Sequence, residues 1–357
     1  MIKPLLKIDS PIIGMQEIPV AFFSNLEDSV NFGDHLFPVW FNTVFGKVAK
    51  DKFELVYNEY KKIISSFERQ KVIEAFKHGN RIQELCENSI EVSCIDINNL
   101  PEDIRLPLKN AFTHLYDSLD NLKYQTHVNE NLLDVLDEFA DINNIEICPF
   151  CGIEGYINVE GEPRQTLDHW LYKENYPFAA ANFDNLMPIG DKCNRRPAKG
   201  TKNVLFDETR TNRVVSFYPY KTHQSIDISF RFINEPVSTN ITDNDWELVI
   251  QPQNPIEQDI FDSWNTTFNI ETRYNDFVRK RIIPKWEKDY IGFIEEDHKT
   301  NQAQDLKEFK EHLKLWKATF KKKSDPRAIL FRAFANYLIN DATDAYLSGL
   351  CENFKRL

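Results

Sequence analysis

Apolar residues recur every three or four positions through most of residues 1–145, and this is the period of an α-helix. Proline interrupts helical hydrogen bonding because it has no backbone N–H, and the segment 99–107 contains two prolines. We therefore expect an N-terminal helical domain over 1–145, with a connection between two helices at 99–107. The three clearest apolar stripes are Phe37, Trp40, Phe41 and Val44; Val56, Tyr60, Ile63 and Phe67; and Leu108, Phe112, Leu115 and Leu119.

The region 224–357 changes from a strand period to a helix period. Apolar and polar residues alternate over 226–232, which predicts a half-buried strand, and 246–251 is the expected partner strand. The segment 214–218, just before this region, also has the composition of a strand. Two helical stripes follow, one over 306–320 and one over 328–347. We expect a C-terminal region made of a β-hairpin followed by helices.

The stretch 147–202 follows neither period and instead gathers residue types that carry chemistry. Residues 156–159 and 165–169 flank a Glu-Gly-Glu-Pro turn, which predicts two short strands with His169 at the end of the second. An Asp-His dipeptide alone is more often a hydrogen-bonded core pair. Here it stands in an ordered set of pairs: Cys148 and Cys151, Asp168 and His169, Asn185 and Leu186, Cys193 and Asn194, and Lys199 and Gly200.

This ordered set resembles the HNH endonucleases, over about a sixth of the chain. The resemblance implies a ββα-metal module at 146–223 that hydrolyses phosphodiester bonds with one divalent ion. The expected fold class is then α+β, with the module embedded in a mainly α-helical protein and a small antiparallel sheet after it. The resemblance leaves the flanking regions unexplained.

The resemblance also implies roles for individual residues. His169 would be the general base that accepts a proton from the attacking water, because the pKa of imidazole lies near neutral pH. Asp168 and Asn194 would bind Mg²⁺ or Mn²⁺ through oxygen atoms, and Asn185 would orient the loop that follows the histidine. The expected substrate-binding residues are basic: Arg195, Arg196, Lys199 and Lys202. Pro197 is expected to end the short helix of the module early.

Cys148 and Cys151 form a knuckle typical of a structural Zn²⁺ site. Zinc-bearing HNH proteins close this site with a second cysteine pair, whereas this chain has Cys193 at the second position and Gly190 at the first. One interpretation is a zinc ion held by three cysteines with a fourth ligand such as Asp191 or a residue of another domain. The other is a knuckle that has lost its metal and is held by packing.

The charge distribution limits how the chain can bind nucleic acid. The formal net charge is −12, whereas nucleic-acid-binding proteins usually carry basic surfaces. Two basic strips, 191–221 and 299–323, each contain eight Lys or Arg against three acids. The first strip begins at the suspected site and could attract a phosphate backbone there. The second is more typical of a solvated helix face.

These observations predict an HNH endonuclease that acts on DNA rather than RNA, with an anti-phage defence role and an ATPase partner suggested by architecture alone. Two alternatives stay open: an inactive HNH or zinc-knuckle scaffold that binds a protein or nucleic acid, and a restriction, homing or recombination nuclease. No apolar run is long enough for a membrane span, and the first fourteen residues lack a secretory core, so a cytoplasmic location is expected. The oligomeric state stays open.

Overall fold

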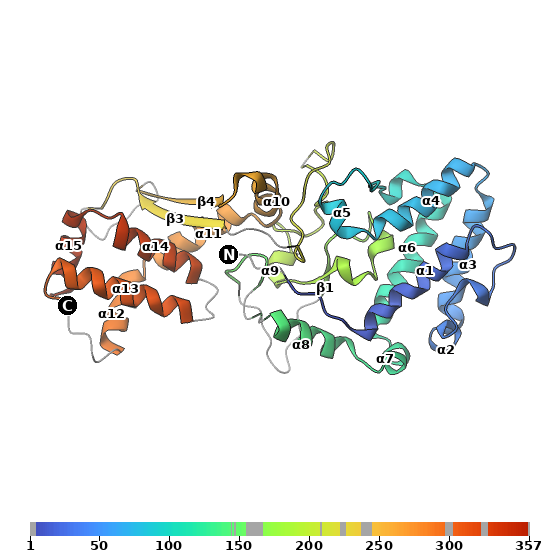
Figure 1. The fold of residues 1–357 in the computed structure, drawn as a ribbon, viewed down its shortest axis with the longest axis horizontal. Coiled ribbons are helices and arrows are strands. Elements are labelled where there is room, and N and C mark those ends of the chain that lie inside the picture. Colours follow the sequence, from blue (N-terminus) through green and yellow to red (C-terminus); the bar gives the residue numbers. More distant parts are fainter. Residues whose placement is uncertain are drawn as a thin grey trace. The chain divides into compact units, whose positions relative to one another are not determined.

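The computed structural model describes residues 5–143, 145, 148–154, 167–207, 209–221, 226–236, 245–296, 303–322 and 328–355 (Figure 1). The chain divides into two compact units. We call residues 4–145 and 163–222 the helical unit, and residues 1–3, 146–162 and 223–357 the C-terminal unit. Over the described residues, each unit is mainly helical and contains one two-stranded antiparallel sheet. The α+β fold class is therefore confirmed, while the predicted domain boundaries stay a prediction.

The helical unit is built from nine described helices and the two strands of the first sheet. Among its elements, α3 and α6 pack directly against each other, and their apolar faces form the centre of the unit's core. The elements are α1 (Glu17–Asn25), α2 (Phe41–Val44), α3 (Gly46–Lys62), α4 (Ser66–Gly79), α5 (Ile82–Cys86), α6 (Glu102–Asp117), α7 (Leu122–Val128), α8 (Leu132–Asn143), β1 (Leu167–His169), β2 (Leu186–Pro188) and α9 (Asp191–Asn194).

Two predictions about this unit were wrong in detail. The predicted break at 99–107 lies partly inside α6, which begins at Glu102 and includes Pro107. A proline there removes one backbone hydrogen bond, and the buried face of α6 outweighs that loss. The predicted stripe from Val56 to Phe67 is divided between α3 and α4, because the Ser65 side chain accepts a hydrogen bond from the Glu68 N–H and starts a new helix.

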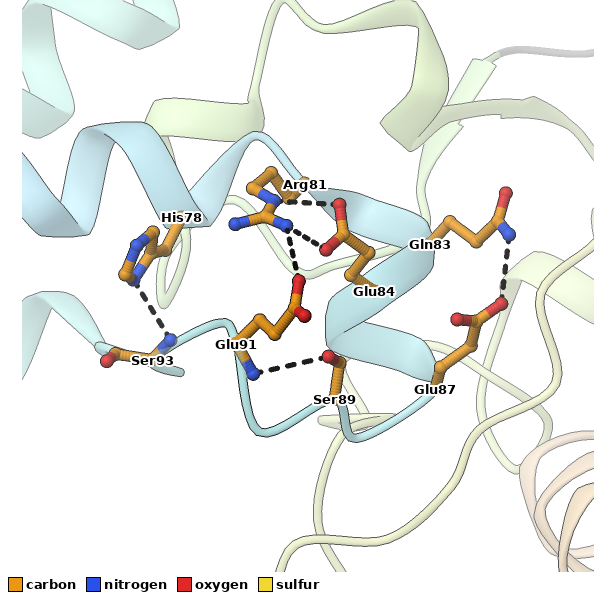
Figure 2. A network of polar contacts seen from close by, with 8 residues as sticks. All are labelled: His78, Arg81, Gln83, Glu84, Glu87, Ser89, Glu91 and Ser93. Carbon is orange, nitrogen blue, oxygen red and sulfur yellow. Dashed lines mark hydrogen bonds and ion pairs between the residues drawn. The ribbon is translucent and has the colours of Figure 1, made fainter.

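A polar network fixes the turn between α4 and α5 (Figure 2). Arg81 pairs with Glu84 through two guanidinium nitrogens and lies 3.6 Å from a carboxylate oxygen of Glu91. The Ser93 N–H donates to Nδ1 of His78. These contacts stabilise the turn between α4 and α5. Helix α5 in turn packs against the last segment of the helical unit, which lies before residue 222.

That packing explains why the segment 214–218 is not a strand. Arg213 donates to the carbonyl of Leu85, and the Ser216 N–H donates to the carbonyl of Cys86. One backbone group of the segment, the Ser216 N–H, is thus bonded to α5, and another, the Val214 N–H, donates to the carbonyl of Leu205. Just before this segment, the described residues form an isolated antiparallel bridge between Phe206 and Arg213.

The C-terminal unit contains the second sheet, whose strands confirm the predicted hairpin. Strand β3 (Ile226–Phe232) pairs antiparallel with β4 (Trp246–Pro252), and Phe232 lies opposite Trp246. Phe230 packs edge-on against Phe334, so one face of the hairpin rests on α14. The helices are α10 (Gln258–Phe268), α11 (Ile270–Phe277), α12 (Trp286–Glu296), α13 (Leu306–Lys322), α14 (Ala328–Asn340) and α15 (Asp344–Phe354), with a π-helical turn at Val278–Ile282.

The two predicted C-terminal helices correspond to three elements. The stripe Leu306, Phe309, Leu313, Trp316 and Phe320 lies on α13 as predicted. The helix predicted over 328–347 is divided into α14 and α15, because Thr343 caps a new helix by accepting from the Tyr346 N–H. None of the helices formed by the described residues is long and apolar enough to cross a membrane.

Candidate functional site

Strands β1 and β2 and helix α9 place the residues of the suspected site in the helical unit. In the antiparallel pair, Asp168 lies opposite Met187 and His169 opposite Leu186. Helix α9 begins three residues after β2 and ends at Asn194, before Pro197, as predicted. The predicted strand at 156–159 and its turn lie outside the described residues, so the described partner of β1 is β2.

His169 is buried, with 7 % of its surface exposed, and its ring is held from two sides. Its Nε2 lies 3.0 Å from the carbonyl oxygen of Ala180, and its ring centroid lies 4.4 Å from that of Tyr116. Because a carbonyl oxygen accepts but cannot donate, Nε2 carries the proton of the neutral ring. The lone pair is therefore on Nδ1, and this nitrogen is the one able to accept a proton.

The surroundings keep His169 neutral. Burial lowers the pKa of His169 to about 3, and the positive charges of Lys173 and Lys199 act in the same direction. The hydrogen bond to Ala180 opposes this effect. The imidazole is thus a base that is never protonated near neutral pH, although its low pKa also weakens it as a proton acceptor.

Acidification should destabilise the protein through His169. Because the unfolded histidine binds its proton near pH 6.5 and the folded one near pH 3, the stabilising contribution is complete above pH 6.5 and is lost as the pH falls between these values. Lowering the pH from 7 to 5 should reduce the free energy of unfolding by about 2 kcal/mol more in the wild type than in His169→Gln. Urea unfolding at both pH values measures this difference.

The glutamine variant is a matched control because its amide can still donate to the Ala180 carbonyl. Burial raises the pKa of Asp168, which changes stability in the opposite direction, but both proteins keep Asp168, so its contribution cancels to first order. An equal pH dependence in the two proteins would contradict the burial of a neutral His169.

Asn185 holds the loop that follows His169. Its side-chain oxygen accepts from the Leu171 N–H at 2.6 Å, and its amide nitrogen donates to the carbonyls of Leu171 and Ala179 at 3.1 Å each. The side chain is fully buried. These three side-chain hydrogen bonds go to the backbone on both sides of the loop, which is the arrangement expected of an orienting residue. The same loop places Phe178 among the rings of Phe23, Phe76 and Phe112.

Asp168 forms an ion pair with a buried lysine. The Lys199 ammonium lies 2.5 Å from Oδ2 of Asp168 and donates to the carbonyl of His169 at 2.7 Å. The Lys199 side chain is 0 % exposed and that of Asp168 is 15 % exposed. Burial raises the pKa of Asp168, and Lys199 opposes this by favouring the charged carboxylate.

This arrangement does not present a magnesium site. Mg²⁺ needs oxygen ligands at about 2.1 Å in an octahedron, whereas the carboxylate of Asp168 already faces an ammonium group. Among the described residues, Asp168 belongs to no group of three or more His, Cys, Asp and Glu side chains close enough to share an ion. Asn194, the second expected ligand, is half-buried at the last position of α9.

A backbone turn after α9 brings Lys199 to β1. The Lys199 N–H donates to the carbonyl of Cys193, and the Gly200 N–H donates to that of Asn194. Gly200 has φ +47°, in the left-handed region, and a Cβ placed on it would lie 2.8 Å from Cγ of Arg196. Glycine is therefore required next to Lys199 for both conformational and steric reasons.

We expect Gly200→Ala to lower the free energy of unfolding by about 1 to 2 kcal/mol, because the added methyl group is strained in this conformation and meets Arg196. Urea unfolding measures this effect. Gly79→Ala is the matched control in the same unit: it lies in α4, and its added Cβ would meet Phe178 at an ordinary 3.6 Å. Equal stability of the two variants would contradict the proposed requirement at Gly200.

The other basic residues of the predicted substrate surface make local contacts. Arg195 pairs with Asp191 at 2.8 Å, and both side chains are exposed. Arg196 donates to the Thr201 hydroxyl at 2.7 Å. Lys202 is half-buried. Direct contacts thus join Asp168, Lys199 and the main chain of His169, whereas Arg195 and Arg196 remain on the surface of the turn.

The cysteine knuckle forms a second cluster, with a ligand that the sequence analysis missed. The sulfur atoms of Cys148, Cys151 and Cys193 and a carboxylate oxygen of Glu154 all lie within 4.8 Å of one another. The three cysteines are buried. Thiolates and carboxylates are ordinary zinc ligands, so this group could bind a metal ion such as zinc. The structure thus offers Glu154, rather than Asp191, as the fourth ligand.

The local fold of the knuckle follows from its sequence. The Gly152 N–H donates to the carbonyl of Cys148, and Gly152 adopts φ +63°, which closes a tight turn. The Cys148 N–H then donates to the carbonyl of Glu154, which brings that residue back over the turn. Trp264 and Tyr274 brace the turn by donating to the carbonyls of Phe150 and Cys151. An acid three residues after the second cysteine was the available sequence signal.

Comparison with known proteins identifies no relative: no family model, no characterised protein and no solved structure matches the chain. Function is therefore inferred from the side chains described above.

Proposed function

We propose that the chain is an HNH-type endonuclease that depends on a divalent ion and hydrolyses phosphodiester bonds of DNA. The observation that carries this proposal is the state of His169. Its Nε2 is engaged by the Ala180 carbonyl, which leaves a neutral ring with its lone pair on Nδ1. A neutral imidazole with its lone pair on Nδ1 is able to accept a proton from water, although its lowered pKa makes it a weak base. In the sequence, Asp168 and Asn185 also stand at positions of the same family pattern.

The basic turn after α9 supports a polyanionic substrate. Arg195 has 75 % of its side chain exposed, and it lies with Arg196 and Lys202 on the segment that also carries Lys199. These cations could contact phosphate groups, which generally fix the position of a nucleic acid without reading its sequence. Because the net charge is −12, we also propose that a partner, of which an ATPase is one candidate, supplies part of the affinity for DNA.

A second candidate function is a scaffold without catalytic activity, stabilised by zinc. Two observations favour it: Asp168 is already paired with Lys199, and His169 is 7 % exposed. A buried ion pair of this kind can serve to fix one conformation of a core. The scaffold would use its helical surfaces to bind a protein or nucleic acid.

Incubation of supercoiled plasmid with the purified full chain distinguishes the two functions. The nuclease should nick or linearise the plasmid with Mg²⁺ or Mn²⁺ and stop in EDTA, leaving 5′-phosphate and 3′-hydroxyl ends that DNA ligase can rejoin. The scaffold should leave the plasmid supercoiled under all three conditions. Cleavage that continues unchanged in EDTA would argue against the proposed metal dependence.

A further inference from the structure

Side chains from α12, α13 and α15 line a small cavity of about 90 Å³ in the C-terminal unit (Figure 1). Two small residues of its wall, Ala303 and Cys351, leave space between larger neighbours. An unfilled apolar cavity destabilises a fold, because the surrounding side chains lose packing contacts. A molecule that packs against these side chains would restore the contacts. The larger apolar residues of the wall are Ile291, Ile294, Phe309 and Phe354.

Tyr290 lines the same cavity, and its hydroxyl has no hydrogen-bond partner among the described residues. Only 1 % of the residue is exposed. The ring stands edge-on to Phe309 and Trp316, with centroids 5.6 Å and 5.9 Å away, and these contacts fix the direction of the hydroxyl. A buried hydroxyl without a partner costs free energy. An acceptor atom inside the cavity would remove this cost.

The other polar group of the inner wall does not supply that acceptor. The Cys351 thiol donates to the carbonyls of Ala303 and Asp305, each at 3.8 Å. Burial raises the pKa of Tyr290, and Cys351 acts in the same direction. Burial also raises the pKa of Cys351. Both groups are therefore neutral near pH 7, and the tyrosine hydroxyl keeps the proton that it can donate.

The charged residues of the wall disfavour an anionic ligand. Lys355 is half-buried, and its ammonium is already paired with Glu352 at 2.7 Å. Glu295 lines the cavity from α12 and is exposed, so the cavity opens to solvent beside a carboxylate. A carboxylate or phosphate ligand would meet two acids against one paired lysine. A neutral ligand avoids this repulsion.

We propose that this cavity binds a neutral molecule about one ring in size, such as a cyclic ketone. Its apolar body would pack against α12, α13 and α15, and its single oxygen would accept a hydrogen bond from Tyr290. Apolar cavities of about 150 Å³ bind benzene, so a ring in this smaller cavity extends into the opening beside Glu295. The proposal concerns residues of the C-terminal unit alone and is independent of the proposed nuclease activity.

The test is binding of cyclohexanone to the full-length protein, measured by titration with saturation-transfer difference NMR. Wild-type protein should bind it with a dissociation constant of about 1 mM or lower. Tyr290→Phe keeps the ring and removes the hydroxyl, so it should weaken this binding by roughly five- to tenfold. Methylenecyclohexane, in which a CH₂ group replaces the carbonyl oxygen, should bind equally well to both proteins.

A second pair of variants tests the location of the site. Ile294→Trp fills the cavity from a half-buried position and should abolish binding of both probes. Leu315→Trp is the matched control, because it adds the same side chain at an exposed position of α13 outside the cavity wall. It should bind both probes as the wild type does, and circular dichroism verifies that each variant folds.

Three results would overturn the proposal. The first is the absence of saturable cyclohexanone binding by the wild type. The second is equal cyclohexanone affinity in the wild type and Tyr290→Phe, which would show that the hydroxyl does not contact the ligand. The third is binding that survives Ile294→Trp, which would place the probe elsewhere on the protein.

Discussion

Alanine in place of His169 is expected to slow plasmid cleavage by roughly 10² to 10⁴-fold, the usual contribution of a general base. The hydrogen bond from Nε2 to the Ala180 carbonyl leaves the lone pair of the ring on Nδ1, where it can accept a proton. Alanine has no group that can replace this nitrogen. The measurement is single-turnover nicking of supercoiled plasmid with protein in excess, which isolates the chemical step from product release. The divalent ion is supplied at a saturating concentration.

Two variants control for structural effects of this substitution. His35→Ala removes an exposed histidine in the same unit and should leave the rate unchanged. His169→Gln keeps a donor for the Ala180 carbonyl but lacks a basic nitrogen, so it should be as slow as His169→Ala while folding more stably. A glutamine variant with the wild-type rate would show that His169 orients the loop and does not act as a base.

The second large effect is expected at the cysteine cluster. Wild-type protein should contain about one zinc per chain, and Cys148→Ser should lose it, because serine is a poor zinc ligand. Zinc binding contributes about 10 to 16 kcal/mol to the folding of small zinc domains. Even part of this loss should lower the melting temperature by roughly 10 °C or more. Elemental analysis measures the zinc content, and differential scanning calorimetry measures the melting temperature.

Cys351→Ser is the matched control for this prediction. It replaces another buried cysteine of the C-terminal unit, one whose sulfur lies 3.8 Å from the carbonyls of Ala303 and Asp305 and which is not part of the cluster. This variant should keep its zinc and lose less stability. Wild-type protein without zinc, or equal destabilisation in both variants, would favour a knuckle held by packing alone. Glu154→Gln should reduce zinc affinity if the carboxylate is the fourth ligand.

The period of apolar residues correctly predicted those elements in which one face is apolar and packs against the rest of the protein. The alternation over 226–232 and the stripe from Leu306 to Phe320 both led to the correct element, because the apolar side chains of each share one face that is buried or half-buried. Pro107 misled the prediction, since packing of α6 in the core outweighs the local preference of proline. Periodicity alone predicted one continuous helix around residue 65 and another around residue 343. In the structure, N-caps at Ser65 and Thr343 begin a new helix at each of these positions.

The candidate site was predictable as a set of residues but not as a set of contacts. The resemblance to the HNH family predicted that Asp168, His169 and Asn185 belong to one arrangement, and their catalytic roles stay a prediction. The structure shows the hydrogen bonds by which Asn185 holds the loop after His169. The spacing could not show that Lys199 turns inward, because this depends on the left-handed turn at Gly200. Glu154 was missed because a single acid beside a cysteine pair has no distinctive pattern.

The most direct test of the proposed function is cleavage of a plasmid in water enriched with ¹⁸O, in the presence of Mg²⁺ or Mn²⁺, followed by mass spectrometry of the new ends. If His169 activates water, each new 5′-phosphate should carry one ¹⁸O atom, the 3′-hydroxyl should carry none, and His169→Ala should yield few such ends in the same time. Absence of cleavage by the wild type, or label-free 5′-phosphates, would contradict hydrolysis at this site.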